Sequence, residues 1–130
     1  MGEAVMMRAD PIVHVIDDDI SVRESVCLLL STVGFDCREY ETVQDFLSGH
    51  EPSVSGCIVL DVRLPGMSGL EFQSRLGQLG ITLPVVMMTG HTEAPMTLKA
   101  LNAGAAHFLT KPFQAQEMID AVSSVMASAK

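Results

Sequence analysis

The sequence predicts an α/β fold: a single doubly wound, five-stranded parallel sheet with five helices on its two faces. Between residues 12 and 128, short apolar runs alternate with stretches whose apolar residues recur at helical spacing. Such alternation produces a parallel sheet, because each helix carries the chain back across the sheet before the next strand begins. Most of the runs are apolar throughout, which is typical of strands that helices bury on both faces.

The composition fits one globular domain. The chain has 130 residues, 48% of them hydrophobic, which is one domain's length and enough apolar material for a core. Its 8 basic and 16 acidic residues give a net charge of −8, which disfavours binding to nucleic acid or to an anionic membrane. No apolar run approaches the roughly 18 residues of a membrane span, so we expect a cytoplasmic protein without membrane contact. We divide the chain into an N-terminal extension over 1–10 and a domain over 11–128.

The first unit begins with the β-branched run at 12–16, which predicts a buried strand. Ser21 and Glu24 have the spacing of a capping box and therefore predict the start of a helix. Gly34 predicts its end, since glycine is common just beyond the last helical turn. The apolar face of this helix recurs every three or four residues, at Val22, Val26, Leu29, Leu30 and Val33.

The second and third units follow the same order. The mixed polar run at 36–40 predicts a strand at the edge of the sheet, and 42–47 predicts a short helix. The apolar run at 57–60 predicts the third strand. Ser68 and Glu71 repeat the capping-box spacing at the start of the next helix. The apolar face of that helix comprises Phe72, Leu76 and Leu79.

The fourth and fifth units complete the predicted sheet. Apolar runs at 84–88 and 106–109 predict the last two strands, and a helix over 93–103 is expected between them. The last helix shows one apolar face, formed by Met118, Ile119, Val122, Val125 and Met126.

Cysteine usage indicates neither a disulfide framework nor a zinc site. Cys27, Cys37 and Cys57 are an odd number, and their separations of ten and twenty residues match no zinc-binding pattern. We therefore expect three free, buried thiols in a reducing compartment.

Polar side chains stand just beyond the carboxyl ends of four predicted strands. They are Asp17, Asp18, Asp61, Thr89 and Lys111. Because ligands of open parallel sheets bind outside these strand ends, we expect the five side chains to meet in one crevice. Three carboxylates about 5 Å apart repel one another by roughly 3 kcal/mol per pair, so they favour a divalent cation, and oxygen ligands favour Mg²⁺ or Mn²⁺.

This set of groups is suited to phosphoryl transfer. A carboxylate can attack phosphorus and become an acyl phosphate. A metal ion and a lysine together neutralise the charge of the transferred group, and a threonine hydroxyl supplies a further hydrogen bond.

Four stretches carry a resemblance to a known family. They are Val-Ile-Asp-Asp-Asp at 15–19, Leu-Asp-Val-Arg-Leu-Pro-Gly-Met-Ser-Gly at 60–69, Met-Thr-Gly-His at 88–91 and Phe-Leu-Thr-Lys-Pro-Phe at 108–113. In this order and spacing, over about 11–128, the sequence resembles the receiver domain of two-component response regulators. The last two stretches are most similar to the FixJ-like branch of transcriptional regulators. The resemblance implies the CheY-like, flavodoxin-like fold with strand order 2-1-3-4-5.

The resemblance also implies roles for the acidic residues. Asp61 corresponds to the phosphoacceptor. Asp18 would ligate Mg²⁺ directly, Asp17 mainly through water, and the backbone carbonyl of Arg63 would supply a further ligand. Asp19 is expected to be a solvated residue near the helix start and not a ligand.

Further roles are implied for the phosphoryl group's other partners. Thr89 would bond a phosphoryl oxygen and Lys111 would pair with the group, with the bond from Lys111 to Pro112 expected to be cis. Phe108 matches the aromatic residue that switches position. Arg63 and His91 occupy the two variable positions beside the site and would tune dephosphorylation, with a plain surface role as the alternative.

The implied function is a phosphorylation switch. A sensor histidine kinase would phosphorylate Asp61 and so repack the face formed by the fourth helix, the fifth strand and the fifth helix, through which similar proteins form homodimers. The chain would be no enzyme, although it assists its own phosphorylation and dephosphorylation. We expect it to be the receiver of a longer transcriptional regulator, whose DNA-binding output domain is absent from this chain. A stand-alone receiver is the alternative.

Two other functions remain to be weighed. In a haloacid-dehalogenase-type phosphatase, Asp17 would be the nucleophile and Asp19 the acid/base, with Thr89 and Lys111 as the later motifs. An acidic pair should then follow the lysine on a strand, but only one predicted helix follows, and Asp61 would have no role. The other alternative is a receiver-like domain that only binds partners.

Overall fold

The computed structural model describes residues 11–49, 55–64, 66–90 and 104–128. Along the chain the elements are β1 (Ile12–Ile16), α2 (Ile20–Ser31), β2 (Asp36–Tyr40), α3 (Val43–Gly49), β3 (Gly56–Asp61), α4 (Gly69–Arg75), β4 (Val85–Thr89), β5 (His107–Thr110) and α6 (Ala115–Ser128). The described part thus contains five strands and four helices. The helix expected over 93–103 and the extension over 1–10 lie outside the described residues.

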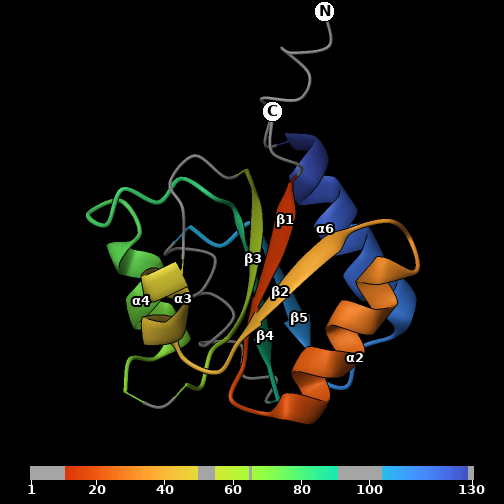
Figure 1. Cartoon of the computed structure of the whole chain (residues 1–130), viewed down its shortest axis with the longest axis horizontal. Helices are drawn as coiled ribbons and strands as arrows, with labels where there is room; N and C mark the ends of the chain where they lie inside the picture. Colours follow the sequence, from red (N-terminus) through yellow and green to blue (C-terminus); the bar gives the residue numbers. More distant parts are fainter. Residues whose placement is uncertain (1–10, 50–54, 65, 91–103, 129–130) are drawn as a thin grey trace, which may run out of the picture.

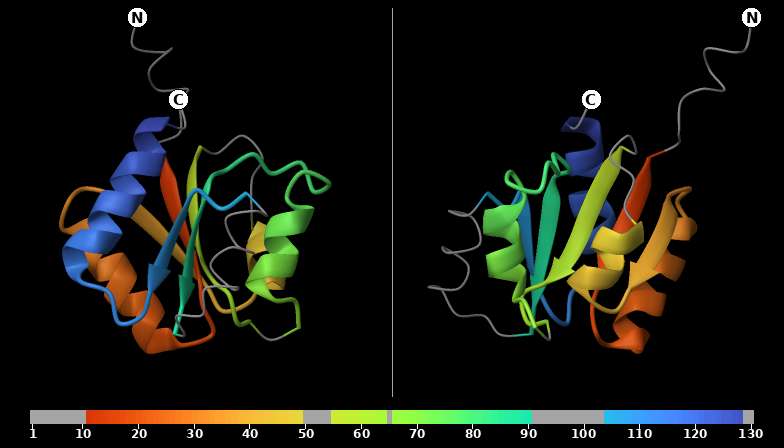
Figure 2. Two further views of the ribbon diagram at one scale, coloured as in Figure 1. Left: turned by 180° about the vertical axis from the view of Figure 1, so that it is seen from behind. Right: turned by 60° about the vertical axis from the view of Figure 1, so that its left-hand side comes forward.

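The strands form one parallel sheet in the order β2-β1-β3-β4-β5, which confirms the predicted topology (Figure 1). β2 lies at an edge, as its polar sequence predicts, while β1, β3 and β4 are buried along their whole length. α2 and α6 cover one face of the sheet, and α3 and α4 cover the other (Figure 2). None of the helices within the described ranges could cross a membrane.

Strand alternation divides the core into two layers. Even-numbered residues of β1 and β3, such as Ile16 and Leu60, join Phe46 and Phe72 in the layer under α3 and α4. Odd-numbered residues of the same strands join Met118 and neighbouring residues of α6 in the layer under α2 and α6. This explains why apolar and polar residues do not alternate along β1 and β3: on both faces of these strands the side chains pack under helices.

One predicted helix start is wrong and another is confirmed. α2 begins at Ile20, and its N-cap is Asp19, whose carboxylate accepts a hydrogen bond from the Ser21 N–H at 2.9 Å. An aspartate is as good an N-cap as serine, so the helix begins before the predicted capping box at Ser21. At α4 the prediction holds, since the Ser68 hydroxyl oxygen accepts from the Glu71 N–H at 3.1 Å.

The ends of α2 and α4 also fall earlier than their apolar faces suggest. α2 ends at Ser31, with Gly34 beyond it at a positive φ of 94°, and α4 ends at Arg75. Val33 and Leu79, which were predicted to lie on the buried faces, are therefore 47% and 45% exposed.

Gly69 holds the start of α4 against the carboxyl end of β3. Its N–H donates to the Val62 carbonyl at 2.7 Å. A Cβ atom at this position would lie 2.3 Å from the backbone oxygen of Asp61 and 2.9 Å from the Val62 Cα. Both neighbours are backbone atoms, so neither can rotate away as a side chain could.

We predict that Gly69→Ala lowers the free energy of unfolding by about 1–3 kcal/mol, since the extra methyl group forces the backbone apart. Urea denaturation measures this. The matched control is Gly77→Ala, because a Cβ at Gly77 meets nothing within 4 Å. A control change within about 0.5 kcal/mol is expected. Equal effects of the two substitutions would contradict the close approach at Gly69.

Candidate functional site

Three charged groups from distant parts of the sequence meet at the carboxyl ends of the strands, which point downward in Figure 1. The Lys111 Nζ donates to Asp17 Oδ2 at 2.9 Å and to Asp61 Oδ2 at 3.0 Å. These partners are 94 and 50 residues away from the lysine in sequence. The predicted convergence of these strand ends is therefore confirmed.

Strand alternation explains why these side chains point the same way. Val15, Val59 and Leu109 all pack in the layer under α2 and α6. Asp17, Asp61 and Lys111 each follow one of these residues by two positions, and so continue the same side of the sheet beyond the apolar layer.

The backbone fixes Asp17 from several directions. The Asp19 N–H donates to Asp17 Oδ1 at 2.9 Å, and the Asp17 N–H donates to the Tyr40 carbonyl at 3.1 Å. The Arg23 guanidinium donates to the Asp17 carbonyl at 2.8 Å and pairs with Glu39 at 3.4 Å. Arg23 was not among the predicted site residues. One sequence feature could have identified it. Arg23 is a basic residue in the first turn of a helix, where the helix dipole disfavours positive charge unless an acidic or carbonyl partner lies nearby.

Asp61 sits in a tight turn at the end of β3. The Arg63 N–H donates to Asp61 Oδ1 at 2.9 Å, and the Val62 N–H donates to the Met88 carbonyl at 2.8 Å. Asp61 is buried, whereas the Arg63 side chain is exposed. The predicted metal contact of the Arg63 carbonyl stays a prediction.

The acidic residues form a cluster with the geometry of a cation site. Asp17, Asp18 and Asp61 each offer one oxygen, and these oxygens all lie within 4.8 Å of one another. At that separation each pair of charges repels by about 3.5 kcal/mol at an effective dielectric of 20. Three carboxylates against the Lys111 ammonium leave a net charge of −2, which a divalent cation balances. Carboxylate oxygens suit Mg²⁺ or Mn²⁺, so the residues present fit the implied metal.

Position separates Asp18 from Asp19. Asp18 is exposed at the rim of the cluster, while Asp17 and Asp61 are buried. Asp19 is not a member of the cluster; its carboxylate caps α2.

Burial and pairing shift two pKa values in the site. Burial raises the pKa of Asp17, and the hydrogen bonds from Asp19 and Lys111 offset only part of that effect. Burial lowers the pKa of Lys111, but its hydrogen bonds to Asp17 and Asp61 outweigh this, so the net shift is upward. The lysine is therefore fully charged at neutral pH.

Thr89 and Phe108 lie on the side of the sheet that α3 and α4 cover. Thr89 ends β4 and is buried. Phe108 pairs with Met87 across the sheet and packs in the layer under α3 and α4. By alternation the Thr89 side chain shares this side with Phe108, two residue pairs nearer the acids. The Lys111 N–H donates to the Thr89 carbonyl at 2.6 Å, which ties the two strand ends together. The switch roles of Thr89 and Phe108 stay predictions.

Two predictions at the edge of the site have different outcomes. His91 lies outside the described residues. The bond between Lys111 and Pro112 is cis, as expected.

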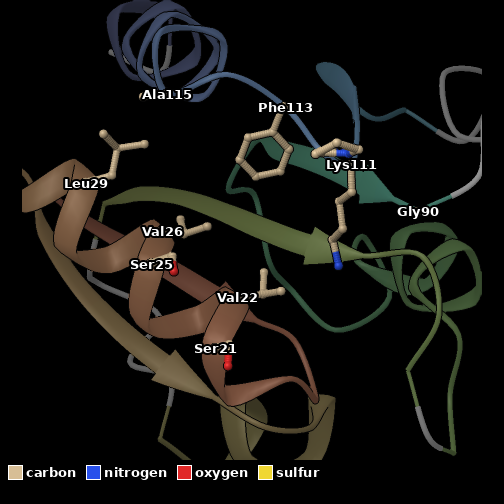
Figure 3. A pocket seen from close by; sticks show the side chains of 10 residues that line it. Ser21, Val22, Ser25, Val26, Leu29, Gly90, Lys111, Phe113 and Ala115 are labelled. Atoms are coloured by element: carbon tan, nitrogen blue, oxygen red, sulfur yellow. The ribbon is translucent and has the colours of Figure 1, made fainter.

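An apolar hollow of about 690 Å³ lies beside Lys111. Figure 3 shows Val22, Val26 and Leu29 of α2 across from Phe113, in the segment that leads into α6. The three acids do not line it. Lys111 is thus shared between the hollow and the charged site, while the acids lie outside the hollow.

We predict that Lys111→Gln lowers the free energy of unfolding at pH 7 by about 1–3 kcal/mol, because the buried carboxylates lose their charged partner. The raised pKa of Asp17 sets the pH dependence. Ionised Asp17 costs stability: the cost is absent below about pH 3.8 and grows as pH rises through the folded-state pKa. The difference in free energy of unfolding between the wild type and Lys111→Gln should therefore shrink as the pH is lowered from 7 to 4, measured by urea titration.

The control for this prediction is Arg75→Gln, which breaks an exposed pair with Glu71 at 3.0 Å. Exposed pairs of this kind contribute about 0.3–0.5 kcal/mol. A loss of stability in Lys111→Gln that is as small as in Arg75→Gln would contradict the role of Lys111 as the partner of the buried carboxylates. A loss that grows as the pH falls would contradict it too.

Comparison with known proteins agrees with this geometry. Residues 13–123 match the family described as response regulator receiver domain. Nodulation protein W of Bradyrhizobium diazoefficiens is 46% identical over 111 residues, covering 85% of this chain and 49% of that protein. The transcriptional regulatory protein FixJ of Azorhizobium caulinodans is 46% identical over 110 residues, covering 85% of this chain and 52% of that protein.

A solved structure shows the same fold. The crystal structure of FixJ-N superposes with a TM-score of 0.83 at 35% identity, covering 92% of this chain and 95% of that one. The chain thus spans about half the length of the curated relatives it matches, and nearly all of this shorter structure.

Proposed function

The chain belongs to the family of response regulator receiver domains, and on this basis we propose that it accepts a phosphoryl group on Asp61 from a sensor histidine kinase. The observation that carries the proposal is the pair of contacts from Lys111 to Asp61 and Asp17, at 3.0 and 2.9 Å. In this arrangement the Asp61 carboxylate, which would be the nucleophile, is already paired with the Lys111 ammonium that would neutralise the acyl phosphate.

In the proposed reaction, an Asp61 oxygen forms a bond to phosphorus as the bond to the donor's imidazole nitrogen breaks. The imidazole leaves with the electron pair of the broken bond. Lys111 stays within reach of the transferred oxygens, and the Arg63 N–H holds Asp61 Oδ1 in place at 2.9 Å. Mg²⁺, held by Asp17, Asp18 and Asp61, would neutralise charge on the phosphoryl oxygens. The domain is not an enzyme in this proposal, since it acts only on itself.

Phosphorylation would then rearrange Thr89 and Phe108, on the side of the sheet that α3 and α4 cover. The carboxylate becomes a group of about −2 charge with three acceptor oxygens, which draws the Thr89 hydroxyl toward it. Phe108 lies on the same side as Thr89 and is half-buried, so it can move into the space that Thr89 leaves. Moving the population from 1:99 to 99:1 requires about 5.5 kcal/mol, which two or three charge-assisted hydrogen bonds supply.

The output we propose is homodimerisation through the helix expected over 93–103, which lies outside the described residues, together with β5 and α6. β5 is an edge strand and only partly buried, so a partner can cover it. By analogy with the curated relatives, which are about twice as long, the domain would control DNA binding by a separate output domain in the cytoplasm. The chain's net charge of −8 agrees with a receiver that does not itself contact DNA.

We predict that acetyl phosphate with Mg²⁺ adds one phosphoryl group per chain, measured by intact mass, and that Asp61→Asn abolishes the addition. Asp45→Asn is the matched control, since Asp45 is an exposed aspartate on α3. The control should be phosphorylated like the wild type.

Other outcomes would favour the alternatives. Rapid repeated hydrolysis of acetyl phosphate, with the phosphoryl group found on Asp17, would indicate the phosphatase. Absence of both phosphorylation and Mg²⁺ binding would indicate a domain that only binds partners.

We also predict that Mg²⁺ stabilises the fold by about 1.4 kcal/mol at ten times its dissociation constant, measured by thermal unfolding. Asp18→Ala should remove most of this gain. Asp19→Ala is the neighbouring control: it loses the α2 cap, at a cost of about 1 kcal/mol, but should keep the full response to Mg²⁺. A Mg²⁺ response that depends on Asp19 and not on Asp18 would contradict the proposed ligand set.

A further inference from the structure

The face of the sheet under α2 and α6 holds all three cysteines. Cys37 of β2 and Cys57 of β3 both pair in register with Val13 of β1, so the three side chains form one row across this face. Cys27 lies on α2, which covers the β2 side of the same face, and it packs against the same apolar layer as Cys37. All three thiols are free.

Within this row the thiols differ in contact and exposure. Cys27 of α2 and Cys37 of β2 pack against the same apolar layer, close enough for their thiols to interact, and both residues are half-buried at the open edge of the sheet. Cys57 is buried in the centre of the sheet. Val13 separates it from Cys37, which puts their strands roughly 10 Å apart, beyond the reach of a disulfide.

We propose that Cys27 and Cys37 form a redox-sensitive pair, which peroxide oxidises to an intramolecular disulfide that links α2 to β2. The proposal rests on the packing of both cysteines against one apolar layer where α2 covers β2, and on their half-buried position at the edge of the sheet. It goes beyond phosphorylation and does not depend on it.

The electrostatics of the pair assign different roles to its members. The interaction between the two thiols raises the pKa of Cys27, and it lowers the pKa of Cys37 against the opposing effect of burial. Cys37 is therefore the thiol that more readily forms the nucleophilic thiolate. Burial raises the pKa of Cys57 to about 12, which makes it unreactive at neutral pH.

The chemistry then proceeds in two balanced steps. The Cys37 thiolate attacks one oxygen of hydrogen peroxide, the O–O bond breaks, and hydroxide leaves to become water, which gives a sulfenic acid. The Cys27 sulfur attacks the Cys37 sulfur, the S–O bond breaks, and the thiol proton leaves with the hydroxyl as a second water. Two thiols and one peroxide thus yield one disulfide and two waters.

The disulfide would reinforce a link that already exists near the site. Arg23, one turn before Cys27 on α2, pairs with Glu39 of β2 and donates to the Asp17 carbonyl. Oxidation would therefore join, covalently, the two elements that Arg23 bridges beside the acid cluster.

The test treats the whole chain with hydrogen peroxide, blocks remaining thiols with N-ethylmaleimide under denaturing conditions, and maps the peptides by mass. The reduced chain should take up three maleimides. The oxidised chain should take up one, on Cys57, and should contain a peptide pair joining Cys27 to Cys37 with two hydrogens fewer. It should remain monomeric on a non-reducing gel.

Matched variants separate the roles. Cys57→Ser should form the same disulfide, while Cys27→Ser should stop at an over-oxidised Cys37. Cys37→Ser should leave Cys27 unmodified at the same dose. The proposal is overturned if Cys57 is modified as fast as Cys37, if only intermolecular disulfides form, or if all three thiols stay reduced. Each variant's folded state is checked by its thermal midpoint before oxidation.

Discussion

The structure depends on a balance of charge at one edge of the sheet. Lys111 holds Asp17 and Asp61 together at hydrogen-bond distance. The three residues come from different parts of the chain: Asp61 ends β3, while Asp17 and Lys111 directly follow β1 and β5. Two of these groups are carboxylates with little exposure to water. Without the ammonium the buried charges would repel each other, so the sheet must be assembled in full before the site is stable.

The charges at this edge do not cancel, and the proposed function depends on the negative charge that remains. One lysine against three carboxylates leaves a net negative site that suits a divalent cation and, in the proposed function, a phosphoryl group bound next to it. Burial raises the pKa of Asp17, which shows that the fold holds this carboxylate at some energetic cost. The apolar layers below the site, built from Phe46, Phe72 and Met118 among others, supply the stability that offsets it.

The sequence predicted the features that local chemistry determines. Apolar runs that stop at a polar residue identified the strands, and Ser68 identified the start of α4. Features set by competition between neighbours were less predictable. Asp19 replaced Ser21 as the cap of α2 because both can cap and Asp19 comes first. The convergence of Asp17, Asp61 and Lys111 was predictable because all three follow strand ends. The contacts made by side chains of α2 were not, since they depend on how α2 lies over β2: Arg23 reaches the Asp17 carbonyl, and Cys27 packs near Cys37.

The most direct test of the central claim uses Mn²⁺ as a paramagnetic probe of the cluster in solution. Bound Mn²⁺ broadens the NMR signals of nearby backbone amides. The account predicts that substoichiometric Mn²⁺ broadens the amides of 17–18, 61–63 and 111 together, while those of 34–36 and 55–56 at the opposite ends of the strands stay sharp. Broadening that spreads over exposed acids elsewhere, or that reaches only one of the three strand ends, would contradict a single shared site.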